Sequence, residues 1–176
     1  TTGLMGMGKS TLARALCREP GMVSISSDVV RKGLAGLDPG ERRYEGFGQG
    51  RYDDAHTART YDALLGPARS LLAQGQSVVL DASFKTAAQR LPALALAQEL
   101  GAAFFVVECR LAEALLRERL QSREAADASV PRKDASDGRL ELLPTQKADF
   151  DPIVEMLSSQ HLSKCSEVRS CDFLAA

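Results

Sequence analysis

The feature that most constrains the fold stands at the start of the sequence, where Gly3–Ser10 reads Gly-Leu-Met-Gly-Met-Gly-Lys-Ser. This run matches the pattern G-x-x-x-x-G-K-[ST], in which glycines allow a tight loop whose backbone N–H groups converge on phosphates. The lysine of the pattern, Lys9, reaches the β- and γ-phosphates, and the hydroxyl of Ser10 ligates Mg²⁺. A helix that begins here adds the positive end of its dipole. The pattern therefore predicts a site for a nucleoside triphosphate and Mg²⁺.

The same pattern requires a strand before the loop and a helix after it. A helical pattern over Lys9–Arg18 meets the second requirement and disfavours the alternative, an ordinary glycine-rich turn. The first requirement is not met, because only Thr1 and Thr2 precede Gly3. We expect the first strand, which is central in doubly wound folds, to be truncated or supplied by an upstream segment.

Short apolar runs alternate with helical patterns along the rest of the chain. Three runs predict strands that are apolar on both faces, as in a parallel sheet covered on both sides: Met22–Ser26, Ser77–Leu80 and Ala103–Cys109. Further helices are predicted over Asp28–Leu37, Asp54–Gln74, Thr86–Leu100, Ala112–Ser122, Leu140–Phe150 and Pro152–Gln160. This alternation predicts an α/β fold, with a mostly parallel central sheet and helices on both faces.

Composition limits the classes of protein that this chain can belong to. With 44% hydrophobic and 26% charged residues, it is neither a disordered chain nor a disulfide-stapled miniprotein. The formal net charge of −1 provides no overall attraction to nucleic acid or to an anionic membrane, and no apolar run is long enough to span a bilayer. Four cysteines without a C-x-x-C pair, and two histidines, argue against zinc and favour a reducing cytoplasm. We expect one domain over residues 1–176.

Three segments together resemble the small P-loop kinases: Gly3–Thr11, the Ser-Ser-Asp-Val-Val-Arg run Ser26–Arg31, and the Val-Val-Leu-Asp-Ala-Ser-Phe run Val78–Phe84. This group includes polynucleotide 5′-kinases, gluconate kinase, chloramphenicol phosphotransferase and zeta-type toxins. The resemblance covers residues 1 to about 155 and is strongest to an ATP-binding domain found fused behind aminoglycoside-phosphotransferase-like domains. It implies the P-loop nucleoside-triphosphate hydrolase fold of the kinase type, ATP and Mg²⁺ as cofactors, and an upstream fused domain as partner.

The resemblance also implies roles for individual residues. The ATP phosphates are expected to contact the loop residues Gly3, Gly6, Met7, Gly8, Lys9, Ser10 and Thr11. Asp28 stands where these kinases place a carboxylate that orients or deprotonates the acceptor hydroxyl. An aspartate before a helix is also a favoured N-cap, and the two roles can coexist. Arg31, one helical turn on, either binds acceptor or phosphate beside Asp28 or is an ordinary solvated arginine.

Asp81 ends an apolar strand at its carboxyl end, the edge where open α/β sheets bind ligands. It is expected to support the Mg²⁺ shell through water together with Ser10, or to line the acceptor pocket. Lys85 and Arg90 follow this strand, and for both of them a solvated side chain is the favoured interpretation.

Two long polar segments interrupt the alternation, Asp38–Arg51 and Arg123–Gly138. Long loops in compact domains are usually functional. We expect residues 38–53 to shape the acceptor site and residues 119–138 to form a lid. The spacing of Arg119 and Arg123 matches the lid arginines of the superfamily, which contact the base and the transferring phosphate, Arg123 being the phosphate contact. The alternative is an ordinary charged helix face.

The sequence therefore favours a Mg²⁺- and ATP-dependent kinase that phosphorylates a hydroxyl of a small molecule, with Lys9, Asp28 and Arg123 as catalytic residues. A polynucleotide 5′-hydroxyl kinase is an alternative, disfavoured because 3 Tyr, 6 Phe and no Trp form no basic stripe with stacking aromatics. A non-catalytic ATP-binding module of a larger protein is another. A guanine-nucleotide switch is disfavoured, because the chain has no N-K-x-D motif.

Overall fold

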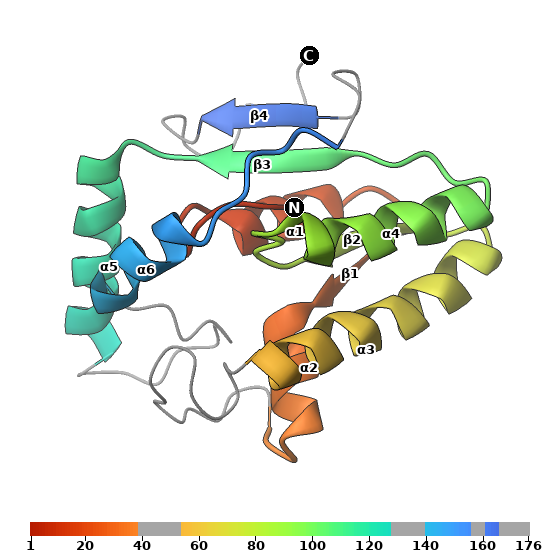
Figure 1. Ribbon diagram of the computed structural model, residues 1–176, viewed down its shortest axis with the longest axis horizontal. Helices are drawn as coiled ribbons and strands as arrows, with labels where there is room; N and C mark the ends of the chain where they lie inside the picture. Colours follow the sequence, from red (N-terminus) through yellow and green to blue (C-terminus); the bar gives the residue numbers. More distant parts are fainter. Residues whose placement is uncertain (39–53, 128–139, 156–160, 166–176) are drawn as a thin grey trace.

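The computed structural model describes residues 1–38, 54–127, 140–155 and 161–165, with the backbone alone for 123–127 and 161–165 (Figure 1). It confirms the α/β class with parallel strands. β1 (Met22–Ser26) pairs in parallel with β2 (Ser77–Asp81), so that Ser26 lies opposite Asp81. β3 (Val106–Arg110) pairs in parallel with β4 (His161–Cys165).

The first residues of the chain lie between these two pairs of strands. Thr2 forms a parallel bridge with Glu108, donating its N–H to Val107 O at 2.9 Å and accepting from Cys109 N at 2.9 Å. On the other side, the Thr1 nitrogen donates to Leu80 O at 2.9 Å. The segment before the loop therefore makes strand-like contacts with both β2 and β3, and it brings the glycine-rich loop to the carboxyl ends of the strands.

The helices are α1 (Lys9–Leu16), α2 (Ser27–Leu34), α3 (Asp54–Ala73), α4 (Ala87–Glu99), α5 (Glu113–Asp127) and α6 (Leu143–Ala148), the last preceded by a short 3-10 turn at Leu140–Leu142. α1 packs against β1 and β2, and α3 packs against β1, β2 and α4. In Figure 1, α5 and α6 lie beside each other beyond the end of β3. None of the described helices is both long and apolar enough to cross a membrane.

Two apolar clusters hold these layers together. The first joins the loop to the last helices and consists of Leu4, Met5, Leu111, Leu116, Leu120 and Leu143. The second lies under α3 and α4 and consists of Leu64, Ala82, Phe84 and Ala93. The first cluster matters most for the site, because it places α5 and α6 directly against the glycine-rich loop.

Several boundaries differ from the sequence-based predictions. The helix expected over Pro152–Gln160 is wrong for Pro152–Glu155, which are not helical, and residues 156–160 lie outside the described part of the chain. The loop expected from Arg123 is wrong for residues 123–127, because α5 continues to Asp127 through Glu and Ala residues of high helix propensity. β4 was not predicted, since its sequence His-Leu-Ser-Lys-Cys is only weakly apolar. Residues 39–53 and 128–139 of the two expected loops lie outside the described residues.

Candidate functional site

The glycine-rich loop closes on itself through the side chain of its own lysine. Lys9 Nζ donates to the backbone oxygens of Gly3 and Leu4, at 2.9 Å in both cases. Gly8 is the N-cap of α1 in the left-handed conformation, and the helix begins at Lys9. The N–H groups of the cap and the first turn have no acceptor within a helix, so this end of α1 supplies the backbone donors and positive dipole end that a phosphate requires.

Two glycines of the loop are required by close approach. A Cβ on Gly3 would lie 2.6 Å from the backbone oxygen of Cys109, and φ of Gly3 is +132°. A Cβ on Gly6 would lie 2.8 Å from Cδ1 of Leu116 on α5, with φ at +74°. The loop is therefore packed between β3 and α5, in a conformation that L side chains rarely adopt.

The loop is also joined to the end of β2. Gly3 N donates to Ser83 O at 3.2 Å, and the Thr2 hydroxyl donates to Ser83 O at 2.8 Å. Asp81, the last residue of β2, is 7% exposed. Because α1 packs against β2, the predicted metal ligands Ser10 and Asp81 lie on neighbouring elements. Among the described residues no three His, Cys, Asp or Glu side chains gather as a metal site. The predicted donor set nevertheless fits Mg²⁺, which usually takes one or two protein ligands together with phosphate oxygens and water.

Asp28 and Arg31 stand at the same edge of the sheet. Ser26, opposite Asp81, ends β1, and α2 begins at the next residue, so Asp28 lies in its first turn. Arg31 Nη1 lies 3.2 Å from Asp28 Oδ1, and the side chains are 11% and 30% exposed respectively. Ser26 occupies the N-cap position, so the N-cap interpretation of Asp28 is wrong. The interpretation of Arg31 as a solvated arginine is also wrong, because the side chain is buried against the carboxylate.

The turn after β2 carries a residue that sequence analysis did not single out. Phe84 has φ of +42°, the single positive value among the described non-glycine residues. Its N–H donates to the Tyr61 hydroxyl on α3 at 3.0 Å, and the two rings meet edge to face with centroids 5.0 Å apart. Burial raises the pKa of Tyr61 to about 12, so this hydroxyl is neutral at physiological pH. A strained turn held this firmly beside a site is typical of functional geometry.

Arg90 holds the same turn from the other side. Its side chain is 1% exposed, donates to Phe84 O at 2.9 Å and to Pro152 O at 3.1 Å, and pairs with the carboxylate of Glu155. Lys85 is also largely buried and pairs with Asp149 at 3.0 Å. The prediction that Lys85 and Arg90 are solvated is therefore wrong. Both side chains fasten residues 149–155 to the turn after β2.

Arg119 and Arg123, the arginines predicted for a lid, are both on α5, one helical turn apart. Arg119 is exposed, and Arg123 belongs to the part of α5 whose side chains lie outside the described set. Leu116 and Leu120 of the same helix are in the first apolar cluster with Leu4 and Met5. The structure therefore brings the helix that carries these arginines against the loop, while the contacts of Arg123 stay a prediction.

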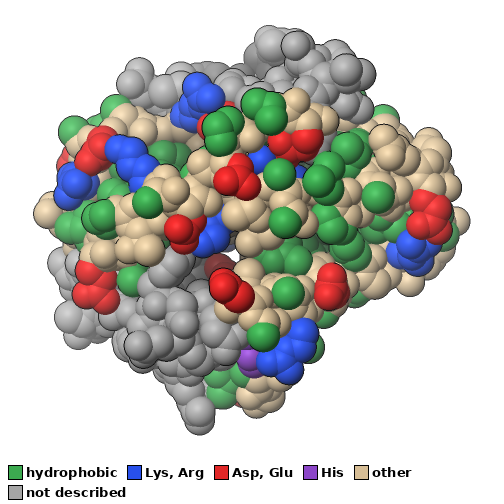
Figure 2. Space-filling view, in the orientation of Figure 1, with side chains coloured by type: hydrophobic (Ala, Val, Ile, Leu, Met, Phe, Trp, Pro, Cys, Tyr) green, Lys and Arg blue, Asp and Glu red, His purple; other side chains and the backbone are tan. Residues whose placement is uncertain are grey.

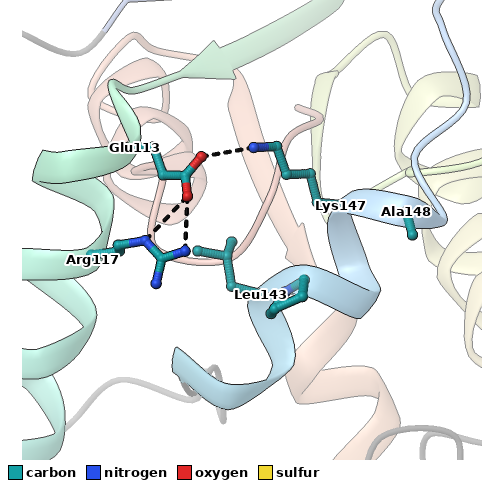
Figure 3. Close-up of a pocket in the computed structure, with 6 residues that line it drawn as sticks. Glu113, Arg117, Leu143, Lys147 and Ala148 are labelled. Atoms are coloured by element: carbon teal, nitrogen blue, oxygen red, sulfur yellow. Dashed lines mark hydrogen bonds and ion pairs between the residues drawn. The ribbon is translucent and has the colours of Figure 1, made fainter.

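A hollow of about 420 Å³ opens between α5 and α6 (Figure 3). It is lined by Glu113, Arg117, Leu143, Pro144, Lys147 and Ala148. Glu113 points between two cations, at 2.8 Å from Lys147 Nζ and 2.8 Å from Arg117 Nη2. Hydrogen bonds from Lys147 and Arg117 lower the pKa of Glu113 to about 2. Among the described residues, none of those predicted for the nucleotide site lines this hollow.

Comparison with known families and sequences gives a family match and sequence relatives. The model of the AAA domain family AAA_33 matches residues 1–153. An uncharacterised protein of Mycobacterium tuberculosis is 31% identical over 151 residues, which are 85% of this chain and 29% of that protein. The chain thus spans less than a third of the length of this relative.

Solved structures share the fold. The APS kinase CysC of Mycobacterium tuberculosis, in complex with AMPPNP and APS, superimposes with a TM-score of 0.61 at 20% identity, covering 96% of this chain and 87% of that one. A gluconokinase from Sinorhizobium meliloti gives a TM-score of 0.57 at 18% identity, with coverage of 96% and 82%. At these identities the likeness establishes the P-loop kinase-type fold.

Proposed function

This chain belongs to the AAA_33 family, and from that premise we propose that it is a Mg²⁺- and ATP-dependent kinase acting on a hydroxyl of a small molecule. One observation carries the proposal. A phosphate-type loop closed by Lys9 stands at the same sheet edge as a carboxylate–guanidinium pair, Asp28 and Arg31. Phosphoryl transfer needs these two parts, a cationic cradle for ATP and a carboxylate for the acceptor.

ATP is bound in this proposal by the loop residues Gly3, Gly6, Met7, Gly8, Lys9, Ser10 and Thr11. Before ATP binds, the ammonium of Lys9 is held by two backbone oxygens of the loop. When phosphates enter, the ammonium exchanges these carbonyls for phosphate oxygens and neutralises charge on the transferring group. Ser10, and Asp81 through water, would hold Mg²⁺, which would supply further charge neutralisation.

Asp28 acts on the acceptor. The acceptor oxygen attacks the γ-phosphorus, the bond to the bridging oxygen of ADP breaks, and the proton of the acceptor passes to the Asp28 carboxylate or to water. Arg31 orients the carboxylate through the 3.2 Å contact. From α5, Arg119 contacts the nucleotide base and Arg123 the transferring phosphate. Residues 38–53 shape the acceptor pocket.

A small-molecule acceptor is favoured over a polynucleotide. On the face of the molecule in Figure 2, Lys and Arg side chains of the described residues are interspersed with Asp and Glu and form no stripe of one sign. Binding of a nucleic acid backbone depends on a contiguous basic surface. A gluconokinase and an APS kinase with the same fold act on small molecules by their names, which supports the same preference.

The test separates nucleotide binding from transfer. Lys9→Ala is expected to abolish ATP binding, measured by calorimetry. Asp28→Asn is expected to bind ATP normally and to lower acceptor-dependent ADP release by about 10²–10⁴-fold, the usual contribution of a general base. The acceptor is found by measuring ADP release with sugars, nucleosides, aminoglycosides and 5′-hydroxyl oligonucleotides.

Arg18→Ala is the matched control for the lysine, since Arg18 is an exposed cation just beyond the end of α1 and should leave ATP binding unchanged. An Asp28→Asn protein with normal turnover would overturn the assignment of the base. Tight ATP binding without turnover on any acceptor would favour the non-catalytic module, and turnover on oligonucleotides alone would favour the polynucleotide kinase.

A further inference from the structure

Inside the phosphate-type loop, one backbone group is held by a side chain from the far end of the domain. The N–H of Met5 donates to the side-chain oxygen of Gln146 on α6, at 2.7 Å and across 141 residues of sequence. Gln146 is 8% exposed, and the hydrogen bond is buried. A buried polar side chain on a surface helix is unusual unless it has a partner that repays its burial. Here that partner is a loop of the nucleotide site.

Apolar packing alone does not fix the orientation of this peptide group. Leu4 and Met5 belong to the cluster that includes Leu143, the first residue of α6. Such contacts set the position of the loop but are not directional. A hydrogen bond is directional, because it weakens steeply away from linear geometry. The Gln146 oxygen therefore fixes the rotation of the peptide plane at Met5.

This restraint stands where the loop most needs one. Leu4 and Met5 lie between Gly3 and Gly6, both with positive φ. Glycine has wide backbone freedom, so the peptide groups between the two glycines can rotate at low energetic cost. A bond to Met5 removes that freedom. It also commits this N–H to α6, while the amides from Gly6 onward form the phosphate cradle.

We infer that Gln146 is a positioning residue of the nucleotide site, which holds the Met5 amide and so keeps the loop in the shape that receives the phosphates of ATP. The inference rests on the proposed function, because it assigns this loop to ATP. It makes α6 part of the nucleotide site, although no residue of α6 belongs to the motif.

The test compares two neighbouring residues of α6. Gln146→Met keeps the length of the side chain but removes the acceptor for the Met5 N–H. We expect calorimetry to show ATP binding weakened about tenfold, the effect of leaving one buried donor unsatisfied. Inorganic tripolyphosphate, which has no base, should lose the same factor. Lys147→Met is the control, since Lys147 is an exposed residue of the same helix and forms its ion pair with Glu113 on α5.

Three results would overturn the inference. One is unchanged binding of ATP and tripolyphosphate by Gln146→Met. Another is a loss for ATP but not for tripolyphosphate, which would place Gln146 at the base instead of behind the loop. Equal losses in both α6 variants would also overturn it, because they would show a general effect of the helix.

A measurement on the unaltered protein covers the case in which Gln146→Met does not fold. Hydrogen exchange of the Met5 amide without nucleotide should be slow, since the bond to Gln146 exists before ATP arrives. Fast exchange of the Met5 amide would show that Gln146 does not hold it, and would refute the inference. If the wild-type protein binds no ATP while this amide is protected, the proposed function fails, whereas the hydrogen bond from Met5 to Gln146 is upheld.

Discussion

Two loops meet at the carboxyl ends of the strands, and they are held in different ways. The phosphate-type loop, Gly3–Lys9, is closed by Lys9 of its own motif and seated on a cluster of leucines. The turn after β2, Asp81–Lys85, is held by polar side chains that converge from elsewhere. Thr2, Tyr61 and Arg90 reach Phe84 across 82, 23 and 6 residues of sequence.

The difference shows which residues determine the conformation of each loop. The phosphate-type loop takes most of its shape from its own glycine positions and lysine, and the distant Gln146 adds one hydrogen bond at Met5. The turn after β2 contains no comparable motif. The positive φ of Phe84 is maintained there by three separate hydrogen-bond partners. Strain of this kind persists only where the surroundings over-determine it. We therefore expect the second loop to be the more sensitive to distant substitutions.

The largest expected effect is that of Arg90→Met on stability. Removing the guanidinium leaves Glu155 as a charge with 12% side-chain exposure and removes a donor from Phe84 O and Pro152 O. Loss of one partner from a buried ion pair usually costs about 3–5 kcal/mol, so the free energy of unfolding should fall by about 3 kcal/mol. Urea denaturation measures it.

Arg69→Met is the matched control for that substitution. Arg69 pairs with Glu99 between α3 and α4, with side chains 49% and 57% exposed, and exposed pairs contribute little. Its unfolding midpoint should stay close to that of the wild type. Equal losses in the two arginine variants would mean that Arg90 does not brace the turn, and would remove the contrast between the two loops.

A smaller effect is expected at the first loop, from Gly3→Ala. The added Cβ would stand 2.6 Å from a backbone oxygen of β3, which cannot move away as a side chain can. We expect a loss of about 2 kcal/mol, from the unfavourable φ together with the contact. Gly36→Ala isolates the first term, because φ of Gly36 is +67° and its Cβ would meet open space. If both variants lose the same stability, the close approach to Cys109 contributes nothing to the change in the free energy of unfolding.

The sequence was sufficient for the fold class and for the places of the motif residues. The glycine-lysine pattern and the apolar runs predicted the loop, α1, β1 and β2, because these depend on local periodicity. The structure then shows that β1 and β2 are parallel neighbours, so that Asp28 follows one strand and Asp81 ends the other. β4 could not be predicted from the sequence, since a short and weakly apolar run becomes a strand only when β3 offers it an edge.

The residues that brace the site were missed for a related reason. Tyr61, Arg90 and Gln146 belong to no motif, and each bonds a backbone group outside its own helix, 23, 6 and 141 residues away respectively. An arginine or glutamine within a helical pattern is exposed in most proteins, so burial was not the expected outcome. Only the three-dimensional packing of α3, α4 and α6 around the two loops makes them partners of the site.

The smallest effect, and the finest test of the contrast, is that of Tyr61→Phe. Its ring still packs on Phe84, but the buried Phe84 N–H loses its acceptor, so we expect a loss of about 1 kcal/mol at neutral pH. Because burial raises the pKa of Tyr61 to about 12, the folded state binds this proton more tightly than the unfolded state, whose pKa is about 10. The stability contributed by the protonated phenol is complete below pH 10 and is lost as the pH rises towards 12. The advantage of the wild type over Tyr61→Phe in urea denaturation should therefore shrink across that interval. An advantage that stays constant from pH 8 to 12 would show that the hydroxyl is not buried against the turn.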